Sequence, residues 1–267
     1  MSEASVADGE EPGAPSEPVH PRPPTPSEPE PEKKRSDLLK RMLTAAVLVP
    51  AVLYLIYMGG LWYLGAVVVI ILLGQNEIYG LIRDKGAHPL VGFGLAAGAS
   101  LPVVAYMGNE YHATVLMTVT LLATMVLQLG KTQITEALAS ISGTFFGVFY
   151  VGWLLSHAIV LRFFQDAVVS KYGADAVLEL GIVPDTGAFL MVFTLSIVVW
   201  CDAGAYFAGR AYGKHKLAPA VSPGKSVEGA VGGVVMGTAV GLLAKGIFDV
   251  FFPDLSHFMG WVAAGVL

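Results

Sequence analysis

The chain has 267 residues, of which 54% are apolar and 14% are charged, whereas an ordinary soluble domain is about 25% charged. The formal net charge is −5, and no basic face indicates a nucleic-acid partner. The charged residues are clustered and leave long uncharged stretches, which is typical of a polytopic membrane protein. The single cysteine, Cys201, excludes an intramolecular disulfide. Its position in an apolar stretch indicates a small buried side chain. We therefore expect an all-α integral membrane protein.

The N-terminal segment is acidic and rich in proline. Residues 1–32 contain eight acidic residues, one arginine and nine of the sixteen prolines. Such a segment cannot bury enough apolar surface to offset the entropy lost on ordering. Its long polar stretch before the first apolar run also argues against a signal peptide. We therefore predict a disordered cytosolic tail over residues 1–35 and a transmembrane domain over residues 36–267.

Seven stretches are long and apolar enough to cross the bilayer as helices, and an incomplete eighth begins at Phe258. Lysine and arginine accumulate on the cytoplasmic side of membrane proteins. If the tail is cytoplasmic and the spans alternate, thirteen of the sixteen lysine and arginine residues lie inside. This orientation places residues 210–228 in the cytoplasm. The seven predicted complete spans are 42–58, 61–76, 89–109, 111–130, 137–161, 186–209 and 229–244, and the incomplete eighth is 258–267.

Residues 222–229 read SPGKSVEG and contain the Gly-Lys-Ser ending of a P-loop. A P-loop also requires glycine five residues before Gly224, where this chain has Pro219, and it must join a buried strand to a helix. The preceding segment is instead a predicted transmembrane helix, so we reject a P-loop. The Ser-Pro-Gly sequence still favours a turn. Lys225 and Ser226 then stand just before a helix start, where backbone N–H groups favour an anion. The alternative is a basic loop that only fixes the topology.

Asp202 is an acidic residue inside the apolar stretch 186–209. An unpaired carboxylate within a span costs about 2.5–3.5 kcal/mol on insertion scales, so we expect a functional role or a polar partner. It lies eight residues before Arg210, which is about 12 Å along a helix and therefore just below the cytoplasmic surface. Because Mg²⁺ prefers carboxylate and phosphate oxygens and uses only one or two protein carboxylates, Asp202 is a candidate metal ligand.

Two other features of the spans require an interpretation. Glu77 is a second acid near the inner end of its span, and it is either a further polar partner or a residue that reaches the interface. Glycines recur every four residues on the last complete span, which suits tight helix packing. These glycines, here called the glycine ladder, are Gly229, Gly233, Gly237 and Gly241.

Residues 201–233, CDAGAYFAGRAYGKHKLAPAVSPGKSVEGAVGG, closely resemble the phosphatidate cytidylyltransferases, the CDP-diacylglycerol synthases. The family pattern there is D-[TS]-x-A-Y-x-x-G-[KR]-x-x-G-[KR]-[HT]-[KP]-L-x-P-x-[IV]-S-P-[KG]-K-[TS]-x-E-G-x-x-G-G. The family more often has lysine at Gly224 and an aromatic residue at Val227. The multi-span layout, including GVFYVGWLLSH at 147–157, is also similar to the family, so the resemblance covers roughly residues 36–267. The matching residues are Asp202, Ala205, Tyr206, Gly209, Arg210, Gly213, Lys214, His215, Leu217, Pro219, Ser222, Pro223, Lys225, Ser226, Glu228, Gly229 and Gly233.

The family has a further segment after the next span. It carries an acidic-Ser-Lys-Arg stretch, a Lys-Asp pair and a His-Gly-Gly and Asp-Arg-x-Asp signature with metal and catalytic residues. This sequence stops at Leu267, and DLSHFMG at 254–260 does not match that signature. The resemblance therefore implies an amino-terminal portion of the enzyme, whose active site is incomplete without the remainder.

The resemblance implies that CTP and phosphatidate react to give CDP-diacylglycerol and pyrophosphate at the inner (cytoplasmic) membrane. It also implies the lipid bilayer as a partner and a homodimer. We assign Mg²⁺ binding to Asp202, directly or through water, and phosphate contact to Lys225 with Ser222 and Ser226. The basic rim for the anionic substrates consists of Arg210, Lys214 and His215, and Glu228 orients Lys225 or a water molecule.

Three alternatives stay open from the sequence. A CTP-dependent kinase of polyprenol or phytol would transfer the γ-phosphoryl group instead. A secondary transporter would use Asp202 as a cation or proton site, although no internal repeat supports it and it leaves residues 210–228 unexplained. The third alternative is an inactive fragment.

Overall fold

The computed structural model describes residues 31–108, 110–129, 137–219, 222–256, 259–260 and 264. The chain divides between Val47 and Leu48, within the first helix, and the described residues of the first part, 31–47, are helical. Residues 1–30 lie outside the described residues, so the disordered tail stays a prediction over that range.

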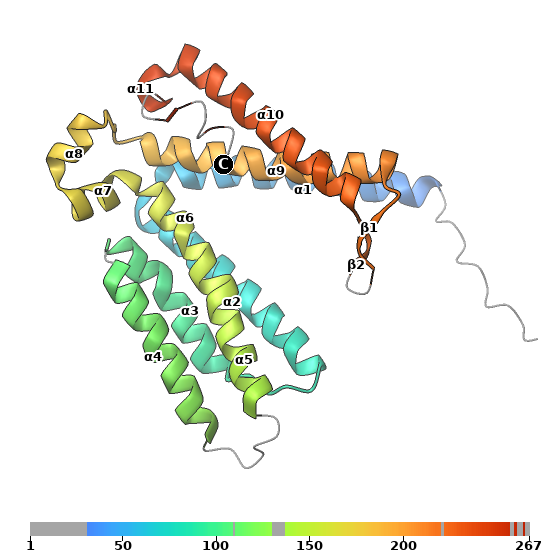
Figure 1. Ribbon diagram of the computed structural model, residues 1–267, viewed down its shortest axis with the longest axis vertical. Helices are drawn as coiled ribbons and strands as arrows, with labels where there is room; N and C mark the ends of the chain where they lie inside the picture. The colour runs from blue at the N-terminus through green and yellow to red at the C-terminus, as the bar shows by residue number, and fades with distance from the viewer. Residues whose placement is uncertain are drawn as a thin grey trace, which may run out of the picture. The chain divides into compact units, whose positions relative to one another are not determined.

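The described chain is almost entirely helical, as expected for an all-α protein, and its one sheet is a short two-stranded hairpin (Figure 1). One long span changes from α- to π-helical geometry at Val148 and returns to α-helix after Trp153. The elements are α1 (Pro31–Met58), α2 (Gly60–Asp84), α3 (Val91–Tyr106), α4 (Glu110–Leu129), α5 (Ala137–Gly147), η1 (Val148–Trp153), α6 (Leu154–Arg162), α7 (Phe164–Tyr172), α8 (Ala174–Glu179), α9 (Thr186–Tyr212), β1 (Lys216–Ala218), β2 (Ser222–Ser226), α10 (Val227–Phe251) and α11 (Pro253–Ser256).

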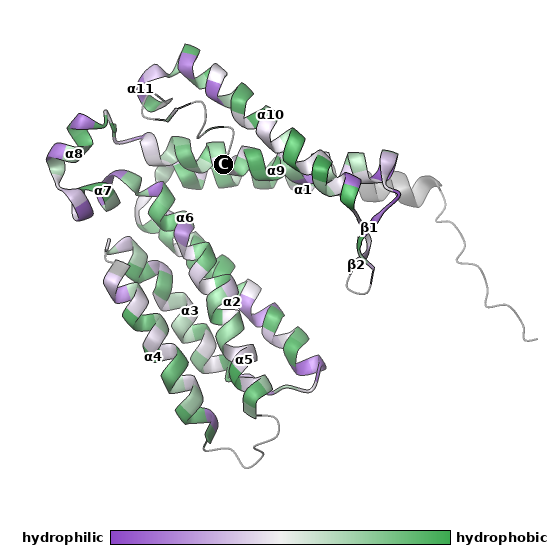
Figure 2. Cartoon of the chain, viewed as in Figure 1, coloured by the Kyte–Doolittle hydropathy of each residue, from purple (hydrophilic) through white to green (hydrophobic). Residues whose placement is uncertain are grey.

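Five helical segments of the described chain are long and apolar enough to cross a membrane. They are α2, most of α4, the continuous segment Ala137–Arg162, α9 and α10. Figure 2 shows hydrophobic residues along these helices and hydrophilic residues gathered near their ends. The protein is therefore a multi-pass membrane protein. Two shorter apolar helices, Leu43–Met58 and Val91–Tyr106, coincide with predicted spans, so the predicted count of seven complete spans is not confirmed. The predicted eighth span falls mostly outside the described residues.

A buried polar cluster joins α2, α3 and α5. Gln75 and Tyr79 lie one turn apart on α2, and both are fully buried. Gln75 Nε2 donates to Gly94 O at 3.2 Å and to Tyr79 Oη at 3.4 Å, and Tyr79 Oη donates to Thr144 O at 3.0 Å. A Cβ atom at Gly98 would lie 2.0 Å from Gln75 Oε1. Glycine on α3 therefore makes room for polar side chains whose donors pair within the protein, while Gln75 Oε1 has no hydrogen-bond partner among the described residues.

Helices α9 and α10 pack along each other through small residues (Figure 1). All four residues of the glycine ladder are buried. A Cβ atom at Gly229 would lie 2.9 Å from Ala205 O, and one at Gly233 would lie 3.1 Å from Cys201 O. This contact confirms the packing role predicted for the ladder, and it leaves Cys201 half-buried at the interface rather than fully buried. The close approach brings the first turn of α10 beside the last turns of α9.

Candidate active site

The connection from α9 to α10 is a β-hairpin. Lys216 pairs with Ser226, and Ala218 pairs with Ser222, in antiparallel register. The Ser-Pro-Gly sequence that favours a turn is extended instead, because β2 pairs with β1 at both of its ends, with an irregularity in the register between them. The strand β2 does lead directly into a helix, as in a P-loop. It is mostly exposed and pairs only with β1 in the described chain, so the rejection of a P-loop agrees with the structure.

Ser226 caps the first turn of α10. Its backbone is extended, and its Oγ accepts a hydrogen bond from Gly229 N at 3.1 Å, which is the geometry of a serine N-cap. A Cβ atom at Gly213 would lie 2.8 Å from Ser226 Oγ, and one at Gly209 would lie 3.2 Å away. The two glycines at the end of α9 therefore leave room for the capping side chain. Its hydroxyl hydrogen stays available to an acceptor, since a hydroxyl both donates and accepts.

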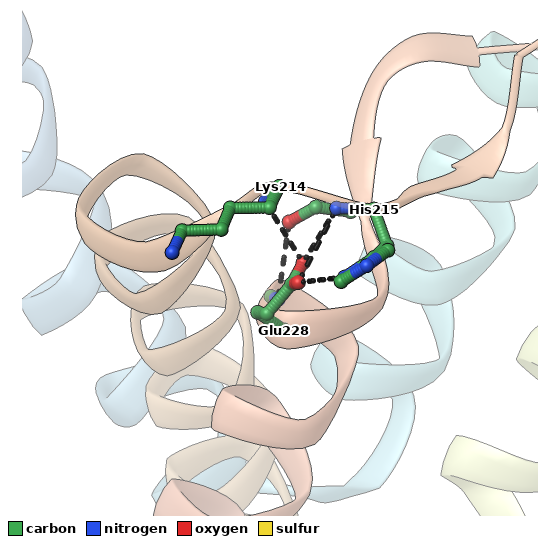
Figure 3. Close-up of polar contacts among 5 residues, drawn as sticks. Lys214, His215 and Glu228 are labelled. Atoms are coloured by element: carbon green, nitrogen blue, oxygen red, sulfur yellow. Dashed lines mark hydrogen bonds and ion pairs between the residues drawn. The ribbon is translucent and has the colours of Figure 1, made fainter.

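Glu228, in the first turn of α10, binds the start of the hairpin (Figure 3). Its carboxylate accepts from Lys214 N at 3.2 Å and from His215 N at 3.2 Å, and it lies 2.6 Å from His215 Nδ1. The ionised carboxylate is an acceptor only, which suits three converging N–H groups. Glu228 therefore bonds to Lys214 and His215, whereas the sequence analysis assigned it to Lys225 or water.

A pocket of about 540 Å³ lies between the end of α9, the hairpin and the start of α10. Asp202 and Arg210 line it from α9, Lys225 from β2 and Ser226 from the helix cap. Arg210 Nη1 donates to Tyr206 Oη at 3.1 Å. In the part of the chain that the structure describes, neither Asp202 nor Lys225 has a side-chain hydrogen bond or ion pair. One carboxylate and two cationic side chains thus share a pocket beside a helix N-terminus, which favours phosphate groups. The lining residues are Asp202, Ala205, Tyr206, Gly209, Arg210, Leu217, Gly224, Lys225, Ser226, Gly229 and Ala230.

The family model described as Cytidylyltransferase family matches residues 39–266 of the chain. The chain belongs to the cytidylyltransferase family. Its relatives include proteins named phosphatidate cytidylyltransferase from three bacteria. The identity is 27% over 217 residues with the relative from Synechocystis sp., which is 76% of this chain and 71% of the relative.

Two further matches are short and more similar. The identity is 56% over 52 residues with the relative from Haemophilus influenzae, covering 20% of this chain and 18% of the relative. It is 56% over 45 residues with the relative from Pseudomonas aeruginosa, covering 16% of this chain and 17% of the relative. These two matches therefore span less than a fifth of each relative's length. No solved structure matches the chain significantly.

The site residues predicted for this cytidylyltransferase-family chain fall into two sets. Asp202, Arg210, Lys225 and Ser226 line the same pocket. The remaining four lie on the hairpin or at its base and do not line the pocket. Two of these are the basic residues predicted for the rim, and the Lys214 side chain extends away from Glu228 in Figure 3. The four are Lys214, His215, Ser222 and Glu228.

Tyr206 is a pocket residue to which the sequence analysis gave no role. It lies between Asp202 and Arg210 at a spacing of four residues on either side. Residues four apart share one face of a helix, so this spacing was a signal that the three side chains lie in one row. The hydrogen bond from Arg210 to Tyr206 holds two members of that row together.

The donor set of this pocket fits a magnesium ion that is bound together with phosphates. No group of three or more His, Cys, Asp or Glu side chains suited to a metal occurs in the described residues. Among the residues that the structure describes, Asp202 is the one acidic residue that lines the pocket. Mg²⁺ keeps several waters and is commonly bound by one or two carboxylates plus substrate phosphates, so a single carboxylate beside a phosphate-binding surface is a suitable arrangement.

Proposed function

We propose that this chain transfers the cytidylyl group of CTP to phosphatidate, forming CDP-diacylglycerol and pyrophosphate. The observation that carries the proposal is the pocket that Asp202, Lys225 and Arg210 line at the N-terminal end of α10, where the first two have no partner among the described residues. Membership of the cytidylyltransferase family and the names of the bacterial relatives support the same reaction.

The proposed orientation brings the two substrates to one pocket. The N-terminus lies in the cytoplasm, and the protein resides in the inner membrane of a bacterial cell. The hairpin then lies at the cytoplasmic surface, where CTP arrives from water and phosphatidate from the bilayer. Both substrates are polyanions, so cationic side chains at the headgroup plane favour their binding. The catalytic domain spans residues 36–267, and the homodimer implied by the resemblance stays a prediction.

The reaction requires positioning and charge neutralisation. A phosphate oxygen of phosphatidate attacks the α-phosphorus of CTP, and the bond from that phosphorus to the oxygen bridging to the β-phosphorus breaks as pyrophosphate leaves. Lys225 and Arg210 bind phosphate oxygens and orient the attack, and the Ser226 hydroxyl donates to one of them. Asp202 would hold Mg²⁺, which when bound neutralises phosphate charge. Lys214, His215 and Ser222 lie outside the pocket, so they contribute to the reaction by supporting the hairpin that carries Lys225.

Isotope labelling tests the reaction and separates it from the alternatives. The protein is reconstituted in vesicles that contain phosphatidate and supplied with Mg²⁺ and CTP labelled at the α- or the γ-phosphorus. We expect the α-label in the lipid and the γ-label in pyrophosphate. A γ-label in lipid, with polyprenol or phytol as the acceptor, would show a lipid kinase. Absence of both labels from lipid would overturn the proposal for this chain and leave the transporter and the inactive fragment.

A further inference from the structure

Glu228 is engaged entirely with the chain's own N–H groups. It stands in the first turn of α10, where a negative charge is favoured by the helix dipole. Its two oxygens face the start of the hairpin, thirteen and fourteen residues earlier in the sequence, and accept from Lys214 N, His215 N and His215 Nδ1. These bonds satisfy two backbone N–H groups that follow the end of α9. Hydrogen bonds to an ionised carboxylate are stronger than bonds between neutral groups, so this carboxylate has a structural use that involves no ligand.

A second set of bonds closes the hairpin at the same place. Val227 N donates to His215 O at 2.9 Å, and Lys216 pairs with Ser226 across the strands. His215 is therefore fixed by its carbonyl, its backbone N–H and its ring. The carboxylate of Glu228 connects the beginning of the hairpin to the helix that follows it (Figure 3).

The bonds of Glu228 and Val227 to residues 214–215 close the base of the hairpin, and this determines where the side chains of β2 lie. Lys225 and Ser226 are the last residues of β2 and line the Asp202 pocket, whereas Glu228 does not line it. Only two residues separate Lys225 from Glu228. A hairpin released at its base would let β2 change its path, and Lys225 would lose its fixed place beside Asp202. The proposed reaction depends on phosphate-binding groups that are held in position.

We propose that Glu228 is a positioning residue, which closes the base of the hairpin and so fixes Lys225 against the phosphates without touching the substrate itself. This inference rests on the proposed function for its kinetic consequence. Its structural consequence, a hairpin held by one carboxylate, is independent of the substrate. The competing roles are direct contact with a substrate and general stabilisation of α10.

A double-mutant cycle tests the kinetic consequence. Glu228→Gln replaces one carboxylate oxygen by an NH2 donor that faces N–H groups, and it removes the negative charge. Lys225→Ala identifies the substrate whose KM depends on Lys225. We expect Glu228→Gln to raise the KM for that same substrate on the order of tenfold. In the Lys225→Ala background, Glu228→Gln should raise that KM less than about twofold, because the residue it positions is gone. Effects that multiply in the double variant would overturn the positioning role. Glu179→Gln, at the exposed end of α8, is the matched control and should leave KM unchanged.

Amide hydrogen exchange tests the structural consequence in the full chain without substrate. We expect Glu228→Gln to speed exchange in residues 214–226 while most of α9 and α10 keep wild-type rates. Unchanged exchange in the hairpin would overturn the inference, and so would faster exchange along the whole of both helices. This readout still decides the matter if the wild-type protein fails to use CTP and phosphatidate. If Glu228→Gln does not fold, Glu228→Asp, which keeps the charge on a shorter side chain, should give the same pattern at smaller amplitude.

Discussion

Two polar clusters of this protein differ in what their groups are bonded to. In the cluster of Gln75, Tyr79 and Thr144, every side-chain N–H or O–H bond goes to an acceptor within the protein, and no member carries a formal charge. Gln75 Oε1 is the one polar side-chain atom of this cluster without a partner among the described residues. In the pocket between α9 and the hairpin, Asp202 and Lys225 are charged, exposed and without a described partner. The first cluster uses its polar groups to join helices. In the second cluster, the Asp202 and Lys225 side chains are available to bind a ligand.

In a membrane, polar groups that lack a partner within the protein are costly, so the difference between the two clusters indicates different roles. A polar group at hydrocarbon depth must be satisfied internally. The donors of the buried cluster are paired with acceptors of the protein, so these donors need no ligand to account for them. A carboxylate within a span is unfavourable unless it meets a partner or water. Asp202 meets neither a described hydrogen-bond partner nor an ion pair. We therefore propose an architectural role for the α2–α3–α5 cluster and a chemical role for the Asp202 pocket.

Asp202→Asn gives the largest expected effect and tests the chemical side of the comparison. The substitution keeps the shape of the side chain but removes the charge that would hold Mg²⁺. We expect Mg²⁺-dependent turnover to fall by at least about 100-fold, because metal-assisted stabilisation of the transferring group supplies several kcal/mol. Thermal unfolding should be unchanged, since Asp202 has no described partner to lose. Normal turnover in this variant would remove Asp202 from the site, and Asp175→Asn on α8 is the matched control.

Gly98→Ala tests the architectural side. A new Cβ atom would lie 2.0 Å from Gln75 Oε1 and 2.5 Å from Gln75 Nε2, so the fully buried glutamine would have to leave its bonds to Gly94 and Tyr79. We expect a loss of about 1–3 kcal/mol in unfolding free energy, as for overpacked cores. Turnover per folded molecule should not change. The free energy is measured by denaturation of the reconstituted protein.

Gly80→Ala is the matched control for Gly98→Ala. It lies on α2, and a Cβ atom there would meet nothing within 4 Å. Because alanine is a better helix former than glycine, this variant should be neutral or more stable. Equal destabilisation by both variants would contradict the packing argument, and a selective loss of turnover in Gly98→Ala would place the buried cluster in the catalytic machinery.

Most of the residues that line the pocket could be predicted from the sequence, whereas fewer of the contacts that hold them in place could be. The long apolar stretches predicted the helices that became α9 and α10, and the ladder of glycines predicted their contact. The short connection between them predicted that Lys225 lies near Asp202, and the pocket bears this out. These inferences worked because each depends on neighbouring residues or on one helix face.

The features that the sequence left unassigned depend on pairings between distant segments. The strand Ser222–Ser226 exists because Lys216–Ala218 lies beside it, and a Ser-Pro-Gly sequence taken alone favours a turn. The partners of Glu228 are set by the register of that hairpin. Likewise, the sequence around Gln75 has no pattern that marks it as a buried residue. Its contacts with Gly94 and Gly98 become visible only when α3 is placed beside α2. Such contacts require knowledge of which elements are neighbours.

Tyr79→Phe removes a single oxygen atom from the buried cluster and should have the mildest consequence of these substitutions. The hydroxyl donates to Thr144 O at 3.0 Å and accepts from Gln75 Nε2 at 3.4 Å, so its loss leaves one carbonyl with a bond fewer while Gln75 keeps its bond to Gly94. Hydrogen bonds between helices in membranes contribute about 0.6 kcal/mol on average and up to about 1.7 kcal/mol. We therefore expect a decrease of about that size in unfolding free energy, with CTP turnover and both KM values unchanged. A larger kinetic than thermodynamic effect would mean that a buried cluster whose donors are paired within the protein also serves the reaction, and pairing of the donors would then no longer distinguish structural from functional polar groups in this protein.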